Sequence, residues 1–312
     1  MNKSFLRFLS ILISISVFAS CGASKKTMTV APTNVVADSK FAPTEKALLW
    51  KIEHTNLAAP SYLYGTIHII PKEDFFYPEG TLQSIDAVKK MVFEIDMNEM
   101  SDMGAQMQLM QKAMMKDGKT LKDLLSDEDY KVVSDHFSEM GLPMMMFERM
   151  KPAFLTVFAS DDMSPTAMQS GAMKSYEMEF MEIAKSKKLE VGGLETIDYQ
   201  LSVFDSIPYS DQAEMLVESI KMSGEGEDEL AKMITIYKDQ DLEGMAAMFS
   251  DESLGDMDIL LNNRNRNWIP VMIEGMQKQA TFFAVGAGHL VGEQGVIALL
   301  RAEGYTVTPI SE

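Results

Sequence analysis

The sequence predicts an α/β fold whose mainly parallel central sheet is built from both chain ends and crossed by a large helical insertion. Three observations carry this prediction. Residues 48–96 and residues 281–309 each run strand, Gly-x-x-His turn, helix, strand, and the residues between them, about 98–276, place apolar side chains three and four apart. Because a connecting helix returns the chain to the same end of a sheet, repeated units of this kind are typical of parallel sheets.

The first unit begins with two apolar runs, "LLWKIE" and "SYLYGTIH", separated by turn-forming residues. This arrangement predicts a β-hairpin. Leu82, Ile85 and Val88 follow at helical spacing, and "MVFEID" reads as a short buried strand. The second unit repeats the order. "TFFAVGAGH" predicts a strand, "GEQGVIALLRAEG" a helix that Gly304 ends, and "YTVTPI" a last strand.

The middle of the chain is predicted to be helical with one interruption. Helical periodicity is clear in residues 121–141, 176–188, 209–222 and 228–249, whereas "LEVGGLET" at 189–196 predicts a further strand and turn. Residues 97–115 space methionines three or four apart, which favours an apolar helix face or an adaptable apolar surface. A copper site of thioether ligands is the less favoured interpretation, because the helical period already explains the spacing.

The N-terminus is predicted to be a targeting segment. Residues 1–20 combine two basic residues, a short apolar run and small residues, as a secretory signal peptide does. Cys21 follows directly and resembles the lipidated cysteine of bacterial lipoproteins; the other interpretation is a leftover residue near an ordinary cleavage site. Residues 21–45 read as the lipidated N-terminus and a flexible tether, and the folded domain is expected over 46–312. We therefore expect an exported lipoprotein of the cell envelope, periplasmic or on the cell surface, attached to a membrane through its lipid.

Composition and missing motifs exclude several classes of function. The chain is 46% hydrophobic with a formal net charge of −18, and Cys21 is its single cysteine. Such an acidic surface repels phosphate, so a nucleic-acid partner is not expected. A single cysteine excludes an intrachain disulfide. The chain also lacks a His-Glu-x-x-His helix, a Gly-x-Ser-x-Gly elbow and a Walker loop.

Two of the four histidines stand in equivalent places. His68 ends Gly65-Thr-Ile-His and His289 ends Gly286-Ala-Gly-His, each after a predicted parallel strand. Ligand sites of open α/β sheets gather at the carboxyl ends of the strands. The pair therefore points to a metal or proton-transfer site, against the alternative of two histidines that cap turns. His54 and His136 have no comparable setting and are expected to be structural or exposed.

Other candidates are charged residues in apolar surroundings. Glu94 lies inside "MVFEID", where burial of a carboxylate requires a cation, a metal or donors. Glu195 follows the strand-like stretch before a helix, where a site role and a helix N-terminal acid explain it equally well. Arg264 and Asn265 belong to the segment "RNRNW", which reads either as a surface salt-bridging helix or as a clamp for an anion or carboxylate.

The ordered motifs "YLYGTIHI", "VFEID", "MKPAF", "GGLETIDYQ", "RNRNW" and "VGAGHLVGEQGVIALLRAEGYTV" resemble the TraB/GumN family, which is related to the TIKI proteases. The resemblance covers about residues 47–310. It implies a fold of the erythromycin-esterase/ChaN-like superfamily and a metal-dependent site. The residues carried over by position are His68, Glu94, Glu195, Arg264, Asn265 and His289. Two departures are Glu177 where the family usually has Asp and Ala153 where it often has Trp.

The expected function is that of a lipid-anchored metal-dependent hydrolase, most simply a peptidase acting on peptides or proteins. His68, Glu94 and His289 are expected at a divalent ion, with manganese or cobalt suspected and zinc as a further option. A carboxylate is expected as general base, and Arg264 and Asn265 as stabilisers of an oxyanion or a substrate carboxylate. The alternative is a haem- or metal-binding lipoprotein without hydrolytic activity.

Overall fold

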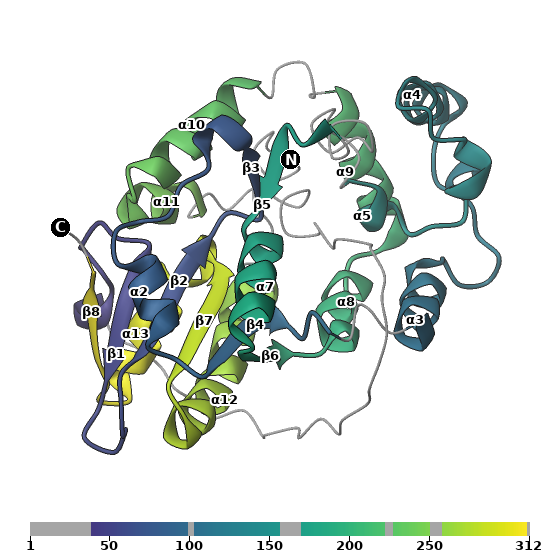
Figure 1. Ribbon diagram of the computed structural model, residues 1–312. Coiled ribbons are helices and arrows are strands. Elements are labelled where there is room, and N and C mark those ends of the chain that lie inside the picture. Colours follow the sequence, from purple (N-terminus) through teal and green to yellow (C-terminus); the bar gives the residue numbers. More distant parts are fainter. Residues whose placement is uncertain (1–38, 99–102, 157–169, 222–226, 250–257, 311–312) are drawn as a thin grey trace.

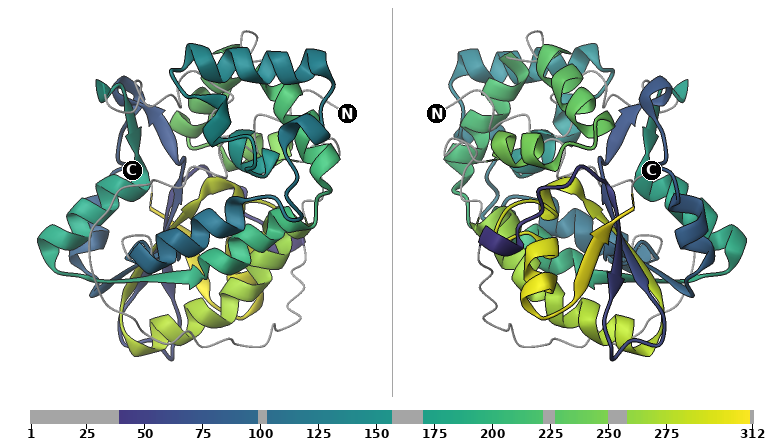
Figure 2. Two further views of the ribbon diagram at one scale, coloured as in Figure 1. Left: turned by 90° about the vertical axis from the view of Figure 1, so that its right-hand side faces the viewer. Right: turned by 90° about the vertical axis from the view of Figure 1, so that its left-hand side faces the viewer.

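A twisted sheet between two helical layers forms the centre of the molecule, with further helices above the carboxyl ends of its parallel strands (Figures 1 and 2). The computed structural model describes residues 39–98, 103–156, 170–221, 227–249 and 258–310. The predicted signal peptide, Cys21 and most of the predicted tether lie outside the described residues. Within the described parts, none of the helices is both long and apolar enough to cross a membrane.

The main sheet is mostly parallel, as predicted. Among the described residues it has six strands in the order β6-β4-β7-β2-β1-β8. β7 pairs in parallel with both β2 and β4, and β4 pairs in parallel with β6, whereas β1 is antiparallel to β2 and to β8. The bounds are β1 Leu49–Glu53, β2 Ser61–Thr66, β4 Lys90–Ile95, β6 Glu190–Glu195, β7 Thr281–Gly286 and β8 Thr306–Pro309.

The predicted hairpin and the strand predicted at 189–196 are both confirmed, as β1–β2 and as β6. The two predicted repeat units do not form side by side in the sheet. β7 lies between β2 and β4, and β2 and β1 lie between β7 and β8. The chain ends are therefore interleaved, so that strands from both ends adjoin at the centre of the sheet.

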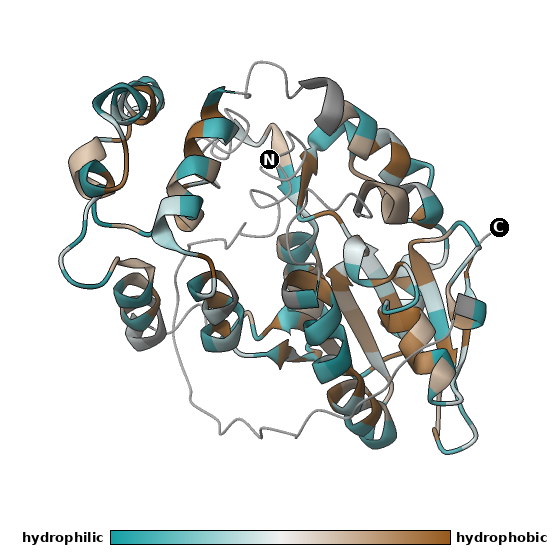
Figure 3. Ribbon diagram, turned by 180° about the vertical axis from the view of Figure 1, so that it is seen from behind, coloured by the Kyte–Doolittle hydropathy of each residue, from teal (hydrophilic) through white to brown (hydrophobic). Residues whose placement is uncertain are grey.

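Four helices cover the sheet. α2 and α7 lie on the face seen in Figure 1, and α12 and α13 lie on the face seen in Figure 3. Their bounds are α2 Thr81–Asp86, α7 Tyr176–Lys187, α12 Asn263–Lys278 and α13 Val296–Ala302. α13 begins later than predicted, because Gly292 is left-handed at φ 77° and residues 287–295 form turns before it. Gly304, at φ 87°, follows its last turn as predicted.

The remaining helices come from the predicted insertion, which also contributes β6, α7 and α12 to the sheet and its layers. The periodic segment 228–249 forms two helices rather than one, because the chain turns at Gln240, which has a φ of 52°. A two-stranded sheet pairs β3 with β5. The bounds are α3 Met103–Ala113, α4 Asp127–Glu139, α5 Pro152–Leu155, α8 Ile197–Asp205, α9 Tyr209–Lys221, α10 Glu227–Lys238, α11 Leu242–Phe249, β3 Ile69–Pro71 and β5 Met173–Ser175.

Apolar packing divides into two clusters. The larger joins the sheet to its covering helices and includes Trp50, Trp268 and the strand residues Phe282 and Phe283. The smaller lies among α4, α9 and the turns beside them, around Val133, Phe137 and Leu216. The predicted methionine face is only partly described: Met107 and Met110 of α3 are more than half exposed, which fits an apolar surface rather than a buried face.

Candidate active site

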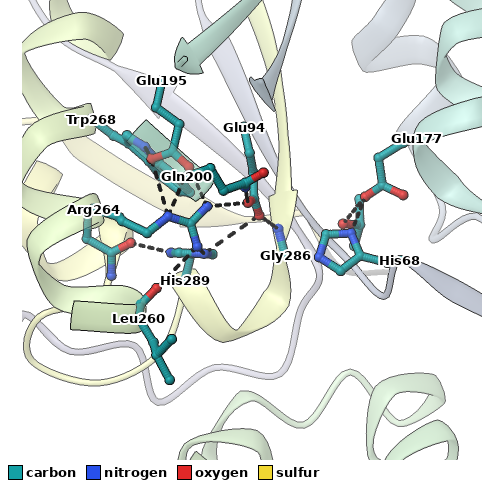
Figure 4. A network of polar contacts seen from close by, with 12 residues as sticks. His68, Glu94, Glu177, Glu195, Gln200, Leu260, Arg264, Trp268, Gly286 and His289 are labelled. Atoms are coloured by element: carbon teal, nitrogen blue, oxygen red, sulfur yellow. Dashed lines mark hydrogen bonds and ion pairs between the residues drawn. The ribbon is translucent and has the colours of Figure 1, made fainter. Parts of the chain in front are cut away.

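Four adjacent parallel strands deliver polar residues to one edge of the sheet. Every one of these strands ends at, or within three residues of, a candidate side chain (Figure 4). Because neighbouring parallel strands end on the same side, residues far apart in the sequence meet there. In sheet order the candidates are Glu195 at the end of β6, Glu94 in β4, His289 after β7 and His68 after β2.

Arg264 is the hub of this cluster. Its Nη2 donates to Glu94 Oε2 at 2.5 Å and to Glu195 Oε1 at 2.7 Å, and its Nε donates to Glu195 at 3.0 Å. Its Nη1 donates to the Leu260 carbonyl at 3.1 Å and lies 3.1 Å from His289 Nε2. All five N–H groups of the guanidinium therefore have an acceptor within the protein. The side chain is 4% exposed, so the surface salt-bridging interpretation is wrong for Arg264.

Arg264 also has no N–H left for a substrate in this arrangement of the described residues. Its acceptors are the protein's own carboxylates, Glu94 and Glu195, where the sequence suggested a substrate carboxylate or an oxyanion. Burial opposes the charged form, but the two carboxylates outweigh it and raise the pKa of Arg264 above its usual range. The guanidinium therefore neutralises the site from within.

His289 is held as a neutral imidazole of defined tautomer. Asn265 donates from Nδ2 to the Gln294 carbonyl at 2.8 Å, which turns its Oδ1 towards His289 Nδ1 at 2.6 Å. Nδ1 must then carry the proton, and Nε2 presents its lone pair to Arg264. Burial and the nearby Arg264 charge lower the pKa of His289 to about 3. Asn265 thus fixes the ring orientation of His289 through its Oδ1.

Glu94 stands between the two histidines. Its Oε1 accepts from the Gly286 N–H at 2.9 Å and lies 3.6 Å from His289 Nε2, and its Oε2 accepts from Gln200 and Arg264. Burial opposes ionisation, but Arg264 and the histidines outweigh it and hold the pKa of Glu94 well below its usual range. Glu94 is therefore a buried, ionised carboxylate with a cation and donors in contact, which its place in an apolar strand requires.

Glu195 is the anchor of Arg264. It accepts two N–H groups from the guanidinium and the indole N–H of Trp268 at 2.8 Å. Trp268 also packs against His289, with ring centroids 4.3 Å apart, and against the Arg264 guanidinium. Burial, together with the neighbouring Glu94 charge, raises the pKa of Glu195 above its usual range.

The cluster has two arms: His289 with its partners forms the first, and His68 with Glu177 forms the second, which is more exposed. Its Nδ1 lies 2.9 Å from Glu177 Oε1, which also accepts from the Thr66 hydroxyl, and Ser175 donates to Glu177 Oε2. The His68 and Glu177 side chains are 15% and 16% exposed. Burial opposes the charge on His68, but Glu177 outweighs it and raises the pKa of His68 to about 9. Glu177 thus serves as the orienting acid of this histidine.

The two arms converge beside Gly286. A methyl group placed on its Cα would lie 3.3 Å from Glu94 Oε1, 3.6 Å from His68 Nε2 and 3.7 Å from His289 Cδ2. Glycine at this position therefore leaves room among three side chains that the sequence singled out. Gly65, at the other motif, is closed against Leu290 and Ala287, so its glycine serves packing.

The chemistry of these side chains fits a divalent ion. Both imidazoles have Nδ1 held by an oxygen acceptor, which is how metal-binding histidines are usually oriented, and Glu94 is ionised. As placed, however, no three His, Cys, Asp or Glu side chains in the described parts of the chain are grouped closely enough to hold a metal ion. Arg264 contacts two of the three candidate ligands, His289 and Glu94.

Sequence reasoning missed two contributors, Gln200 and Trp268. Trp268 is one α-helical turn beyond Arg264 on α12, so helical spacing from that candidate would have found it. Gln200 lies on α8, five residues beyond Glu195 of β6, and no single periodicity connects the two. The remaining histidines lie elsewhere: His54 packs on Tyr305 and His136 is buried on α4. Ala153 is fully buried in α5, outside the contacts of the cluster.

Comparison with known proteins relates this chain to one family model and to relatives named metalloproteases. A family model described as the TraB/PrgY/gumN family matches residues 48–309. The chain is 22% identical to Metalloprotease TIKI1 and 21% identical to Metalloprotease TIKI2 of Danio rerio, over 84% and 85% of its length. It is 20% identical to human Metalloprotease TIKI1 over 87% of its length. The chain spans 62–64% of the length of these relatives. No solved structure matches.

Proposed function

The chain belongs to the TraB/PrgY/gumN family, and from this premise we propose that it is a metal-dependent hydrolase that cleaves peptides or proteins. The observation that carries the proposal is the convergence of His68, Glu94 and His289 around Gly286. Supporting it, relatives named metalloproteases match most of the chain, although only at 20–22% identity.

In this proposal His68, Glu94 and His289 hold a divalent ion, for which manganese and cobalt are our first candidates and zinc the next. When bound, such an ion polarises a carbonyl oxygen and lowers the pKa of water. Imidazole nitrogens and carboxylate oxygens suit these metals. Glu177 and Asn265 act as positioning residues, because they fix the ring orientation of His68 and His289.

Three further roles are assigned to side chains of the protein itself. Glu94 Oε1 faces the space beside Gly286, so it is the carboxylate oxygen that would face the ion. Glu195 holds Arg264 and is itself held by Trp268, which makes it a positioning residue. Arg264 supplies positive charge close to Glu94, although its N–H groups are all engaged in this arrangement.

The test is cleavage of a peptide library by the purified full chain, with manganese, cobalt or zinc and with a chelator. We expect turnover only with metal. We also expect His289→Ala and Glu94→Gln to reduce turnover by about 100-fold or more, in the range of lost acid–base or electrostatic groups. The matched control is His54→Ala, which removes an imidazole outside the cluster. Turnover that survives both site substitutions would contradict the proposal.

A haem-binding function is the second candidate from the sequence, and the geometry does not favour it. His289 is fully buried, and its Nε2 faces Arg264. An axial haem ligand needs a porphyrin face against that nitrogen. A Soret band on haem titration that is lost in His68→Ala would reverse this preference.

For the cellular setting we propose an exported lipoprotein, supported by residues 1–20 and Cys21. A lipid on Cys21 would anchor the folded domain to a membrane by a tether of about two dozen residues. Membrane fractionation of the wild type and Cys21→Ser tests this. The wild type is expected in the membrane fraction with a mass increase at its N-terminus, and an unmodified soluble wild type would contradict the proposal.

A further inference from the structure

Arg264 and a metal ion compete for the same lone pair. A neutral imidazole whose Nδ1 carries the proton has one lone pair in the ring plane, at Nε2. In His289 that lone pair faces Arg264 Nη1 at 3.1 Å, and Asn265 fixes the tautomer from the other side. The same lone pair would have to bind a metal at about 2.0–2.1 Å. The hydrogen bond and the metal bond therefore exclude each other.

Glu94 shows the same conflict through its charge. Arg264 Nη2 donates to Glu94 Oε2 at 2.5 Å, so the carboxylate already has a cation in contact. Two cations that share one buried carboxylate repel each other strongly, because the surroundings screen charge poorly. Of the three proposed ligands, only His68 is free of Arg264 contacts in the described structure.

Glu195 gives the guanidinium a place to remain when it leaves the other two groups. Arg264 donates to Glu195 from both Nε and Nη2, and Trp268 holds the second carboxylate oxygen. A shift towards Glu195 would release His289 Nε2 and Glu94 Oε2 without leaving Arg264 unpaired. An unpaired buried charge would be far more costly than such a shift.

We propose that Arg264 is an internal competitor of the metal ion: it holds His289 and Glu94 in the ion-free protein and is displaced onto Glu195 when the ion binds. This inference rests on the proposed metal site and adds a control of its affinity. It also explains why the candidate ligands do not already converge at metal-binding distances. Metal affinity in this protein is thereby set by an arginine that is not itself a ligand.

The test is Co²⁺ binding by the full chain, followed by visible absorption. Arg264→Gln removes the competing cation and is expected to bind Co²⁺ about tenfold or more tightly, because the ion no longer has to displace charged hydrogen bonds. Without metal, the variant should melt below the wild type, and Co²⁺ should raise its Tm more. The matched control is Arg266→Gln on the same helix, whose guanidinium bonds Gln294 and Asn263. It should bind Co²⁺ as the wild type does.

Two further measurements keep the test decisive if Arg264→Gln does not fold. Arg264→Lys keeps the charge but not the fork of donors, and it should shift affinity in the same direction by less. In the wild type, Zn²⁺ should move the ¹⁵N resonance of His289 Nε2 and speed solvent exchange of the Arg264 guanidinium hydrogens.

The outcomes distinguish the proposed metal site from the proposed competition by Arg264. If the wild type binds metal but folded Arg264 variants bind no more tightly, or the guanidinium hydrogens stay protected, the competition is wrong and the metal site stands. If no divalent ion binds to any of the proteins, the proposed function fails and this inference fails with it.

Discussion

At the scale of single residues, one glycine decides whether the two histidine arms have space between them. Gly286 has a φ of −54°, which any residue adopts, so its need for glycine is spatial and not conformational. Its N–H also fixes Glu94, a contact that alanine would keep. Activity and stability can therefore be separated at this position.

Gly286→Ala is expected to lower peptide turnover at least about tenfold, because reacting groups tolerate little displacement, and to change the free energy of unfolding by less than about 1 kcal/mol. Turnover and urea denaturation measured on one preparation check this. Gly275→Ala is the control: nothing lies within 4 Å of an added methyl there, and alanine suits a helix. Equal turnover in both variants would contradict the role assigned to Gly286.

Asn265 is expected to control the tautomer of His289. Asn265→Ala removes the acceptor of the buried His289 Nδ1–H, which should cost about 1–3 kcal/mol, and also removes a donor to the half-buried Gln294 carbonyl. In the ion-free protein the ¹⁵N shifts of His289 should change from the Nδ1-protonated tautomer to a mixture, while those of His54 stay constant. Asn265→Asp, which keeps an acceptor, should restore the tautomer. An unchanged His289 spectrum in Asn265→Ala would refute this assignment.

At the scale of elements, one buried glutamine joins three helices. Gln212 of α9 accepts from the Ala153 N–H of α5 at 3.1 Å and donates to the Phe204 carbonyl of α8 and the Ile207 carbonyl beyond it. Its side chain is fully buried. We call these three Gln212 hydrogen bonds the clamp. Because α8 also carries Gln200, which contacts Glu94, the clamp helps to position the site.

Gln212→Leu is expected to destabilise the protein by about 1–3 kcal/mol, because the buried Ala153 N–H loses its acceptor and the Phe204 and Ile207 carbonyls each lose one donor. Chemical denaturation measures the loss. Gln111→Leu on exposed α3 is the control and should stay within about 0.5 kcal/mol of the wild type. A loss no larger than that of the control would show that the three helices are held together without the clamp.

At the scale of the whole molecule, the two histidines give the ion-free protein opposite responses to pH. The pKa of His68 is raised from 6.5 to about 9 by Glu177, so its contribution to stability is complete below pH 6.5 and is lost as the pH rises towards 9. The pKa of His289 is lowered to about 3, so the unfolded chain takes up the proton first, and stability falls as the pH drops from 6.5 towards 3. The other charged side chains that act on both histidines are Glu94 and Arg264.

We therefore expect the free energy of unfolding, measured by urea denaturation with a chelator present, to be greatest near pH 6.5. His68→Gln should flatten the decline on the alkaline side and leave the acidic side as it is. A decline between pH 6.5 and 9 that persists unchanged in His68→Gln would assign it to other groups.

The sequence alone determined the elements and much of the candidate list. Its two-residue and three-to-four-residue apolar periods record which face of each element is buried, so the hairpin, the parallel sheet and the interrupted helical segment could be predicted. The same local logic pointed to His68, His289 and Glu94, because polar residues at the ends of, or inside, apolar strands need partners.

Only the tertiary structure decided which partners those are. Strand order is set by long-range packing, and here it places β7 from the C-terminal part between β2 and β4 from the N-terminal part. That interleaving brings Gly286 and His289 against Glu94 and His68, and it lets α12 direct Arg264 inwards to two carboxylates. Periodicity cannot distinguish this buried arginine from a surface one, since its partners lie 69 and 170 residues away in the chain.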